Sequence, residues 1–190
     1  MKTIVIDVDG VLLDWKANIP FYMIQLGMLS KLNPDWRNYH DADASGLFIN
    51  SDTYEVGKLI AGYAEHDSSK YLPAYPDAYS AVGKLSRAYR LVVLSKFGQG
   101  RVAWFNRQHN LNALFPGMFD QVFCIEYYEK KSNWMRIISD TYDVEYFVDD
   151  SLDNVRDIEE HYPDIKCLHV DRKADPVNAF TNAIQSLTNP

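Results

Sequence analysis

The chain has 190 residues, of which 47% are apolar and 24% charged, as expected for a soluble globular protein of one domain or one domain with a small insert. A net charge of −7 without a long basic block argues against binding to duplex nucleic acid or to an anionic membrane. No apolar run approaches the roughly 20 residues of a membrane span, and the start turns acidic at Asp7, too early for a signal peptide. Cys124 and Cys167 are too few for a disulfide framework, so we expect a cytoplasmic protein with free thiols.

Five short apolar runs predict β-strands, at residues 3–8, 90–94, 121–125, 146–148 and 166–170. The runs are mostly continuous rather than alternating, which is typical of strands buried on both faces of a parallel sheet. Residues with helical spacing fill the intervals between the later strands. Strands that alternate with helices predict an α/β fold with a doubly wound, parallel, Rossmann-like sheet.

One segment, residues 14–72, contains no convincing strand and is too long for a simple loop between a strand and a helix. Asp52 and Glu55 are spaced as a capping box at the start of a helix within it. We therefore predict a helical cap at 14–72, inserted into a core formed by 1–13 and 73–190.

Two pairs of acidic residues follow predicted strands. Asp7 and Asp9 leave the first strand on the same side, and Gly10 permits a sharp turn directly after them. Asp149 and Asp150 end a later strand, and ligands of α/β sheets bind at these carboxyl ends. Either pair alone reads as a turn or a helix cap. Together they indicate a site for a hard cation such as Mg²⁺, which is bound by oxygen atoms and by a substrate phosphate.

Two further positions offer groups that bind phosphate. Ser95 presents a hydroxyl at the end of the strand at 90–94, where it serves equally well as a strand-end cap. Lys130 and Lys131 follow the strand at 121–125, where a lysine neutralises phosphate charge or simply meets solvent.

These four sites, in this order, resemble the motifs of the haloacid dehalogenase-like (HAD) hydrolase superfamily. The resemblance covers residues 1–13 and about 73–170, and the segment 14–72 lies where the family places a helical cap. The position and size of the cap and the Asp149-Asp150 pair are most similar to the 5′(3′)-deoxyribonucleotidase branch.

The resemblance implies a role for each acidic residue. Asp7 would attack phosphorus and form an aspartyl-phosphate, and Asp9 would act as general acid and then as general base. Asp7, the backbone carbonyl of Asp9 and Asp150 would hold Mg²⁺, and Asp149 would orient the metal site or the lysine.

The resemblance also implies that Ser95 and Lys131 hold the phosphate oxygens. Lys130 remains an alternative to Lys131, which we prefer because it directly precedes the predicted helix start at Ser132. Lys96 stands where many relatives have asparagine, so it either contacts the substrate or is exposed. Asn154 stands where some relatives carry another acid.

The resulting hypothesis is a magnesium-dependent phosphomonoesterase that acts on a small phosphorylated metabolite, with a nucleoside monophosphate as the leading candidate. A phosphomutase or phosphotransferase of the same fold and a non-enzymatic HAD-like binding protein are the alternatives. The leaving group and the oligomeric state stay open. Four aromatic residues of the cap could stack on a base, although aromatic residues at helical spacing more often belong to a core: Phe21, Tyr22, Trp36 and Tyr39.

Overall fold

A sheet of five parallel strands forms the centre of the structure, a computed structural model that describes residues 1–39 and 44–188. The strand order is β3–β2–β1–β4–β5. All five predicted strands are confirmed, with ends shifted by no more than two residues: β1 (Thr3–Ile6), β2 (Arg90–Lys96), β3 (Gln121–Ile125), β4 (Val144–Asp149) and β5 (Lys166–His169).

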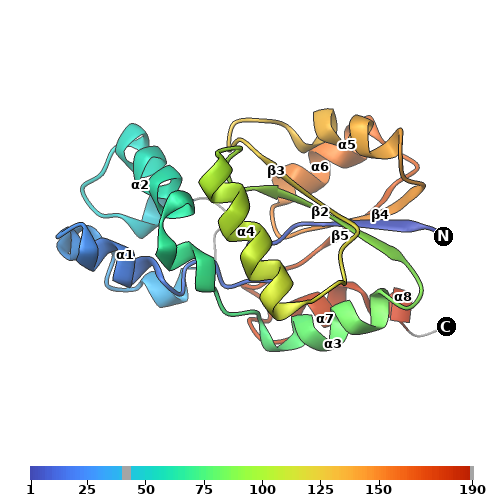
Figure 1. The fold of residues 1–190 in the computed structure, drawn as a ribbon, viewed down its shortest axis with the longest axis horizontal. Helices are drawn as coiled ribbons and strands as arrows, with labels where there is room; N and C mark the ends of the chain where they lie inside the picture. The colour runs from blue at the N-terminus through green and yellow to red at the C-terminus, as the bar shows by residue number, and fades with distance from the viewer. Residues whose placement is uncertain (40–43, 189–190) are drawn as a thin grey trace.

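Helices cover both faces of this sheet, as the continuous apolar strands predict (Figure 1). One face, which includes Ile4 and Ile6, packs against α3 (Pro76–Leu85), α4 (Arg101–Leu114) and α7 (Ala179–Ala183). The opposite face, which includes Val5, packs against α5 (Lys131–Ser139) and α6 (Leu152–His161). The last helix is α8 (Gln185–Thr188). The predicted doubly wound, parallel α/β fold is thus confirmed.

The sheet changes its direction of winding between β1 and β4. From β1 at the centre, the chain builds outward to β2 and β3, then returns to the other side of β1 for β4 and β5. Ile6 pairs with Val148, and the backbone N–H of Asp7 donates to the carbonyl of Val148 at 2.9 Å. The two acidic pairs therefore emerge side by side at the topological switch point, where α/β sheets bind their ligands.

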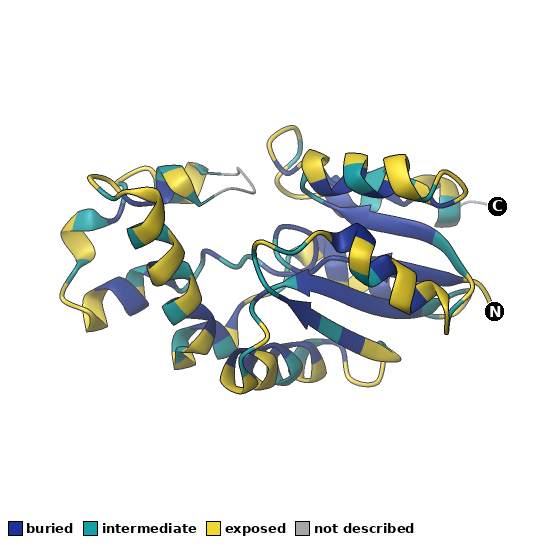
Figure 2. Cartoon of the chain, turned by 90° about the horizontal axis from the view of Figure 1, so that it is seen from above, coloured by how far each residue is buried: buried dark blue, intermediate teal, exposed yellow. Residues whose placement is uncertain are grey.

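The segment 14–72, called the cap segment below, is helical wherever its described residues have regular structure, apart from one isolated antiparallel bridge between Leu32 and Phe48. Asp52 caps its longest helix by accepting a hydrogen bond from the backbone N–H of Glu55 at 2.8 Å, as the capping box predicts. Figures 1 and 2 place α1 and α2 on one side of the molecule and the sheet on the other. Its helices and turns are α1 (Ile19–Gln25), η1 (Leu29–Lys31), η2 (Trp36–Asn38), η3 (Ser45–Leu47), α2 (Thr53–Glu65) and η4 (Asp67–Tyr71).

The cap segment leaves and re-enters the core at one place. The backbone N–H of Asp14 donates to the carbonyl of Pro73 at 3.0 Å, and that of Tyr75 donates to the carbonyl of Leu12 at 2.9 Å. Its apolar residues, among them Met23 and Leu59, belong to the same hydrophobic cluster as the sheet face that carries Ile4. In the described part of the chain, no helix is both long and apolar enough to cross a membrane.

Candidate active site

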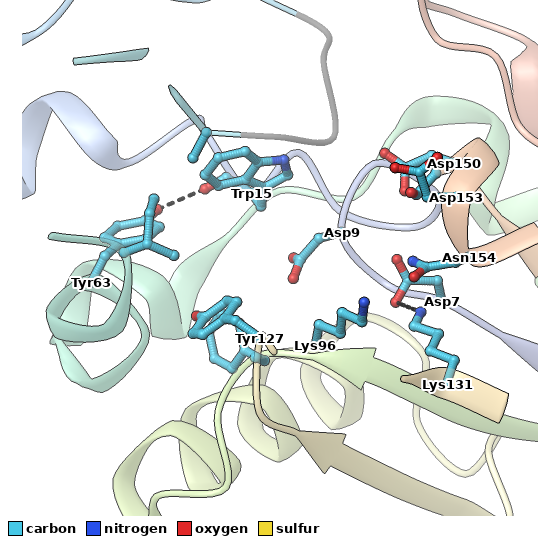
Figure 3. Close-up of a pocket in the computed structure, with 14 residues that line it drawn as sticks. Asp7, Asp9, Trp15, Tyr63, Lys96, Tyr127, Lys131, Asp150, Asp153 and Asn154 are labelled. Atoms are coloured by element: carbon cyan, nitrogen blue, oxygen red, sulfur yellow. Dashed lines mark hydrogen bonds and ion pairs between the residues drawn. The ribbon is translucent and has the colours of Figure 1, made fainter. Parts of the chain in front are cut away.

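Three carboxylates and one lysine meet at the carboxyl ends of β1 and β4. Figure 3 shows Asp7, Asp150 and Lys131 of this group. Asp7, Asp149 and Asp150 each offer an oxygen that lies within 4.8 Å of the other two. Lys131, the first residue of α5, places its Nζ 2.8 Å from Oδ1 of Asp7 and 2.7 Å from Oδ2 of Asp149. Lys130 is 67% exposed and pairs with Asp157 at 3.6 Å. Of the two candidate lysines, Lys131 is therefore the one in the acidic cluster.

The two aspartates that end β4 have different surroundings. Asp149 is fully buried, and besides Lys131 it accepts hydrogen bonds from the backbone N–H of Ser151 at 2.9 Å and from Nδ2 of Asn154 at 3.0 Å. Within the described chain, no hydrogen bond or ion pair reaches the carboxylate of Asp150, which lines the cavity. Asp149 is thus fixed by its hydrogen bonds, whereas the carboxylate of Asp150 faces the cavity without one from the described residues.

These donors fit a magnesium ion. Burial, followed by the neighbouring carboxylates Asp149 and Asp9, raises the pKa of Asp7 to about 7 against the attraction of Lys131. Burial and the charges of Asp149 and Asp7 likewise raise the pKa of Asp150 well above its usual range. Asp7 shares Lys131 with Asp149, whereas Asp150 has no ion-pair partner among the described residues. Together these carboxylates form a hard, negatively charged oxygen site, which is the type that Mg²⁺ prefers.

A tight turn after Asp9 brings Asp150 close to the first motif. Gly10 has a φ of +77°, and a Cβ at this position would lie 1.9 Å from Oδ2 of Asp150. The buried side chain of Arg172 holds this turn by donating from Nε to the carbonyl of Gly10 at 3.0 Å and from Nη2 to that of Val11 at 2.7 Å. Arg172 could not be identified from the sequence, since no local pattern connects it with Gly10, 162 positions earlier.

The carboxylate of Asp9 is bound by an arginine that the sequence analysis missed. Nη2 of Arg107, in α4, lies 2.6 Å from both Oδ1 and Oδ2 of Asp9. The Arg107 side chain is 0% exposed, and its guanidinium carbon lies 3.8 Å from the ring centre of Phe97. One feature of the sequence could have identified Arg107. It lies four residues from both Ala103 and Leu111, which are buried, so helical spacing places its charge on the buried face of the helix.

Ser95 and Lys96, adjacent on β2, point to opposite faces of the sheet. Ser95 is fully buried on the face of Val93, and its hydroxyl has no hydrogen-bond partner among the described residues. The half-buried Lys96 lies on the face of Leu94 and lines the cavity that contains Asp7. Burial, and then the positive charge of Lys131, lower the pKa of Lys96. The structure therefore does not bring the predicted Ser95 hydroxyl to the cavity, but places its neighbour there.

A cavity of about 360 Å³ extends from the acidic cluster to the cap segment. At the far end from Lys131, Trp15 and Tyr63 face Tyr127 across the space, and the Tyr63 hydroxyl donates to the Trp15 carbonyl at 2.9 Å (Figure 3). The four aromatic residues singled out from the cap sequence do not line it. Phe21 is 62% exposed, Tyr22 is buried, and Trp36 and Tyr39 pack against the hydrophobic core.

We expect Mg²⁺ to stabilise the protein more at pH 8 than at pH 5. The pKa of Asp7 in the folded protein, about 7, exceeds its ordinary value of 3.8. In the absence of metal, Asp7 therefore makes its whole contribution to the free energy of unfolding below pH 4 and loses it as the pH rises through 7. Metal ligands must be deprotonated, so Mg²⁺ competes with protons for Asp7 below pH 7. Above pH 7 the bound ion offsets the repulsion among the ionised carboxylates. Urea unfolding with EDTA or Mg²⁺ at both pH values measures this difference. A larger stabilisation at pH 5 would contradict it.

Comparison with known proteins gives one relative in sequence and several in structure. No family model matches the chain. An uncharacterised 32.4 kDa protein of Enterobacteria phage T4, from the Gp30–rIII intergenic region, is 33% identical over 152 residues. The match covers 78% of this chain and 53% of the phage protein, so the chain spans about half the length of that relative.

Similar solved structures are HAD-like proteins. A haloacid dehalogenase-like hydrolase from Streptococcus pneumoniae has a TM-score of 0.65 at 14% identity, over 96% of this chain and 90% of that one. The L-2-haloacid dehalogenase of Xanthobacter autotrophicus, with chloropropionic acid covalently bound, has a TM-score of 0.60 at 15% identity, over 100% and 85%. The HAD-hydrolase YfnB of Bacillus subtilis, bound to magnesium, has a TM-score of 0.58 at 12% identity, over 90% and 88%.

The chain therefore has the fold of the HAD-like hydrolases, as the order of its motifs predicts. At these identities the likeness concerns the fold alone, and the chemistry has to be argued from the site. The closer resemblance to deoxyribonucleotidases stays a prediction.

Proposed function

We propose that this protein is a magnesium-dependent phosphomonoesterase that acts on a small phosphorylated metabolite. The observation that carries the proposal is the position of Asp7, which is paired with Lys131, lies beside Asp150 and opens into the cavity that also contains Asp9. A nucleophilic carboxylate, a metal site and a candidate proton donor thus meet at one end of a cavity that reaches the cap segment.

In the first step, an oxygen of Asp7 attacks phosphorus in line, and the bond from phosphorus to the leaving oxygen breaks. Asp9 gives its proton to that oxygen, which departs as an alcohol. In the second step, a water molecule attacks the phosphorus of the aspartyl-phosphate and gives a proton to Asp9. The bond between Asp7 and phosphorus then breaks, which releases inorganic phosphate and restores both carboxyl groups.

The proton transfer requires a rearrangement of Asp9. In the structure both of its carboxylate oxygens contact Arg107, so neither is free to carry a proton to a leaving group. Asp9 is 21% exposed at its side chain whereas Arg107 is fully buried, so we expect Asp9 to move when substrate enters.

The metal would be held by Asp7, the backbone carbonyl of Asp9 and Asp150. When bound, Mg²⁺ supplies positive charge that stabilises the transferring phosphoryl group. The protein's own contribution is to keep these carboxylates close together. It does so through Lys131, through the hydrogen-bonded Asp149 and through the turn at Gly10.

The acidic cluster favours phosphoryl transfer over dehalogenation, although both reactions occur on HAD-like folds. Displacement of a halide needs neither a proton donor nor a cation, so it gives Asp9 and Asp150 no role. Asp7 and Asp149 share one lysine and Asp150 does not contact it, so the three clustered carboxylates repel each other unless a further cation binds. A metal-dependent reaction on a phosphate uses all of these groups.

A nucleoside monophosphate is the leading substrate candidate. The cavity volume of about 360 Å³ lies in the range of small-molecule sites. Trp15, Tyr63 and Tyr127 provide aromatic walls at the end remote from Asp7, where a base could stack. These residues replace the cap aromatics that we considered from the sequence.

A panel of phosphomonoesters tests the proposal. The purified protein is incubated with nucleoside 5′- and 3′-monophosphates, sugar phosphates and an aryl phosphate, with Mg²⁺ or EDTA, and phosphate release is measured. We expect phosphate release in Mg²⁺ but not in EDTA, and the highest kcat/KM for a nucleotide. An added acceptor alcohol that becomes phosphorylated would indicate a phosphotransferase. Binding of the panel without turnover would indicate a binding protein, and halide release from 2-haloacids without phosphatase activity would overturn the proposal.

A further inference from the structure

Lys96 is a cation at the reacting end of the cavity that has no hydrogen-bond or ion-pair partner within residues 1–39 and 44–188. Its side chain is half-buried, and within the described chain no hydrogen bond or ion pair reaches its Nζ. Figure 3 shows the amine pointing into the space between Asp9 and Asp7. Asp149, Asp7 and Asp157 attract Lys96 without forming an ion pair with it, and burial still lowers its pKa. A partly buried lysine without a direct partner costs free energy, so its position favours an anion that binds there.

Lys131 supplies little of the positive charge that such an anion needs. Its Nζ already lies 2.8 Å from Asp7 and 2.7 Å from Asp149, so its charge is balanced within the protein. Lys96 is the other cation among the described residues that line the cavity. A phosphate dianion that approaches Asp7 and Asp150 meets two negative groups, and Lys96 is placed to offset them.

The hydroxyl expected to bind phosphate lies on the wrong face of β2. Ser95 shares the face of Val93, which packs against α3 and α4, whereas Asp7 follows β1 on the face of Val5. Lys96 shares the face of Leu94, which belongs to the same cluster as Val5. Successive residues of a strand point in opposite directions, so the serine and the lysine cannot both reach Asp7.

We propose that Lys96, and not Ser95, is the residue of β2 that binds the transferred phosphoryl group. This inference rests on the proposed function. The lysine donates from Nζ to a non-bridging oxygen of the phosphate on the side opposite Lys131. The lysine binds the phosphate group of the substrate and inorganic phosphate alike. Its hydrogen bond to the phosphate oxygen strengthens as negative charge develops there in the transition state.

Phosphate binding and turnover test this role in parallel. Calorimetric titration with inorganic phosphate in Mg²⁺ is carried out on wild type, Lys96→Met, Lys96→Arg and Ser95→Ala. Lys84→Met, on the exposed side of α3, is the matched control for the loss of a lysine. We expect Lys96→Met to weaken phosphate binding at least about tenfold and to lower kcat/KM by roughly 10²–10³-fold, the usual cost of one transition-state donor. Lys96→Arg should retain part of the phosphate affinity and part of the kcat/KM. Ser95→Ala should lose less of each than Lys96→Met, and Lys84→Met should match wild type in both.

The outcomes separate this inference from the proposed function. Unchanged phosphate binding in Lys96→Met, or a greater loss in Ser95→Ala, would overturn the role of Lys96 whatever the turnover. If wild type binds phosphate but hydrolyses no ester, the phosphatase proposal fails while the binding data still decide for or against Lys96. Wild type that binds no phosphate in Mg²⁺ overturns both. Circular dichroism checks the fold of each variant, and Lys96→Gln replaces Lys96→Met if the latter does not fold.

Discussion

Asp7→Asn should abolish phosphate release and at the same time make the metal-free protein more stable. An amide is nearly isosteric with the carboxylate but is a poor nucleophile, so the first step cannot occur. Burial disfavours the charged form of Asp7, whose folded pKa is about 7. A neutral amide avoids that cost, and Lys131 keeps its contact with Asp149.

The gain in stability should depend on pH in a defined direction. Wild type loses the contribution of Asp7 as the pH rises from about 4 to 7, at up to about 1.4 kcal/mol per pH unit, whereas the variant has no such titration. In EDTA the advantage of Asp7→Asn should therefore be larger at pH 8 than at pH 5. Urea unfolding measures it, with the exposed Asp164→Asn as the matched control. An Asp7→Asn protein that still turns over near the wild-type rate would refute covalent catalysis by Asp7.

Asp9→Asn should slow turnover by roughly 10²–10⁴-fold, the usual value of general acid–base catalysis. The loss should be greater for alkyl phosphates than for aryl phosphates, because a good leaving group needs no proton. The same change should lower the free energy of unfolding by on the order of 3 kcal/mol, since Arg107 stays fully buried without its anion.

A second substitution separates these two effects. Arg107→Met in the Asp9→Asn background removes the unpaired buried charge, so it should restore much of the stability but none of the turnover. Arg107→Met alone should retain turnover on alkyl phosphates, because Asp9 has to leave this contact to carry a proton to the leaving group. If the single variant loses turnover to the same extent as Asp9→Asn, Asp9 needs the Arg107 contact during the reaction and the proposed rearrangement is wrong. If the double variant is no more stable than Asp9→Asn, the unpaired charge of Arg107 does not destabilise the protein.

The sequence by itself determined the sheet and the edge at which the site lies. The strand β1 (Thr3–Ile6) is an uninterrupted run of buried residues because it lies at the centre of the sheet with helices on both faces, and that pattern is local. Asp52 was recognisable as a helix cap because its partner Glu55 is three residues away. Asp7 and Asp150 could be placed together because all parallel strands end at the same edge, whatever their order in the sheet.

Only the tertiary structure decided which neighbouring side chains face the cavity. Ser95 and Lys96 differ by one position, and the phase of β2 against β1 and β3 determines which of them points toward Asp7. Arg107 reaches Asp9 because α4 packs on one face of the sheet, a contact between residues 98 positions apart. The aromatic walls come from Trp15, Tyr63 and Tyr127, whose convergence depends on how the cap segment returns to the core. Motifs made of neighbouring residues can be recognised in the sequence, whereas contacts between residues far apart in the chain determine which side chains surround them in the folded protein.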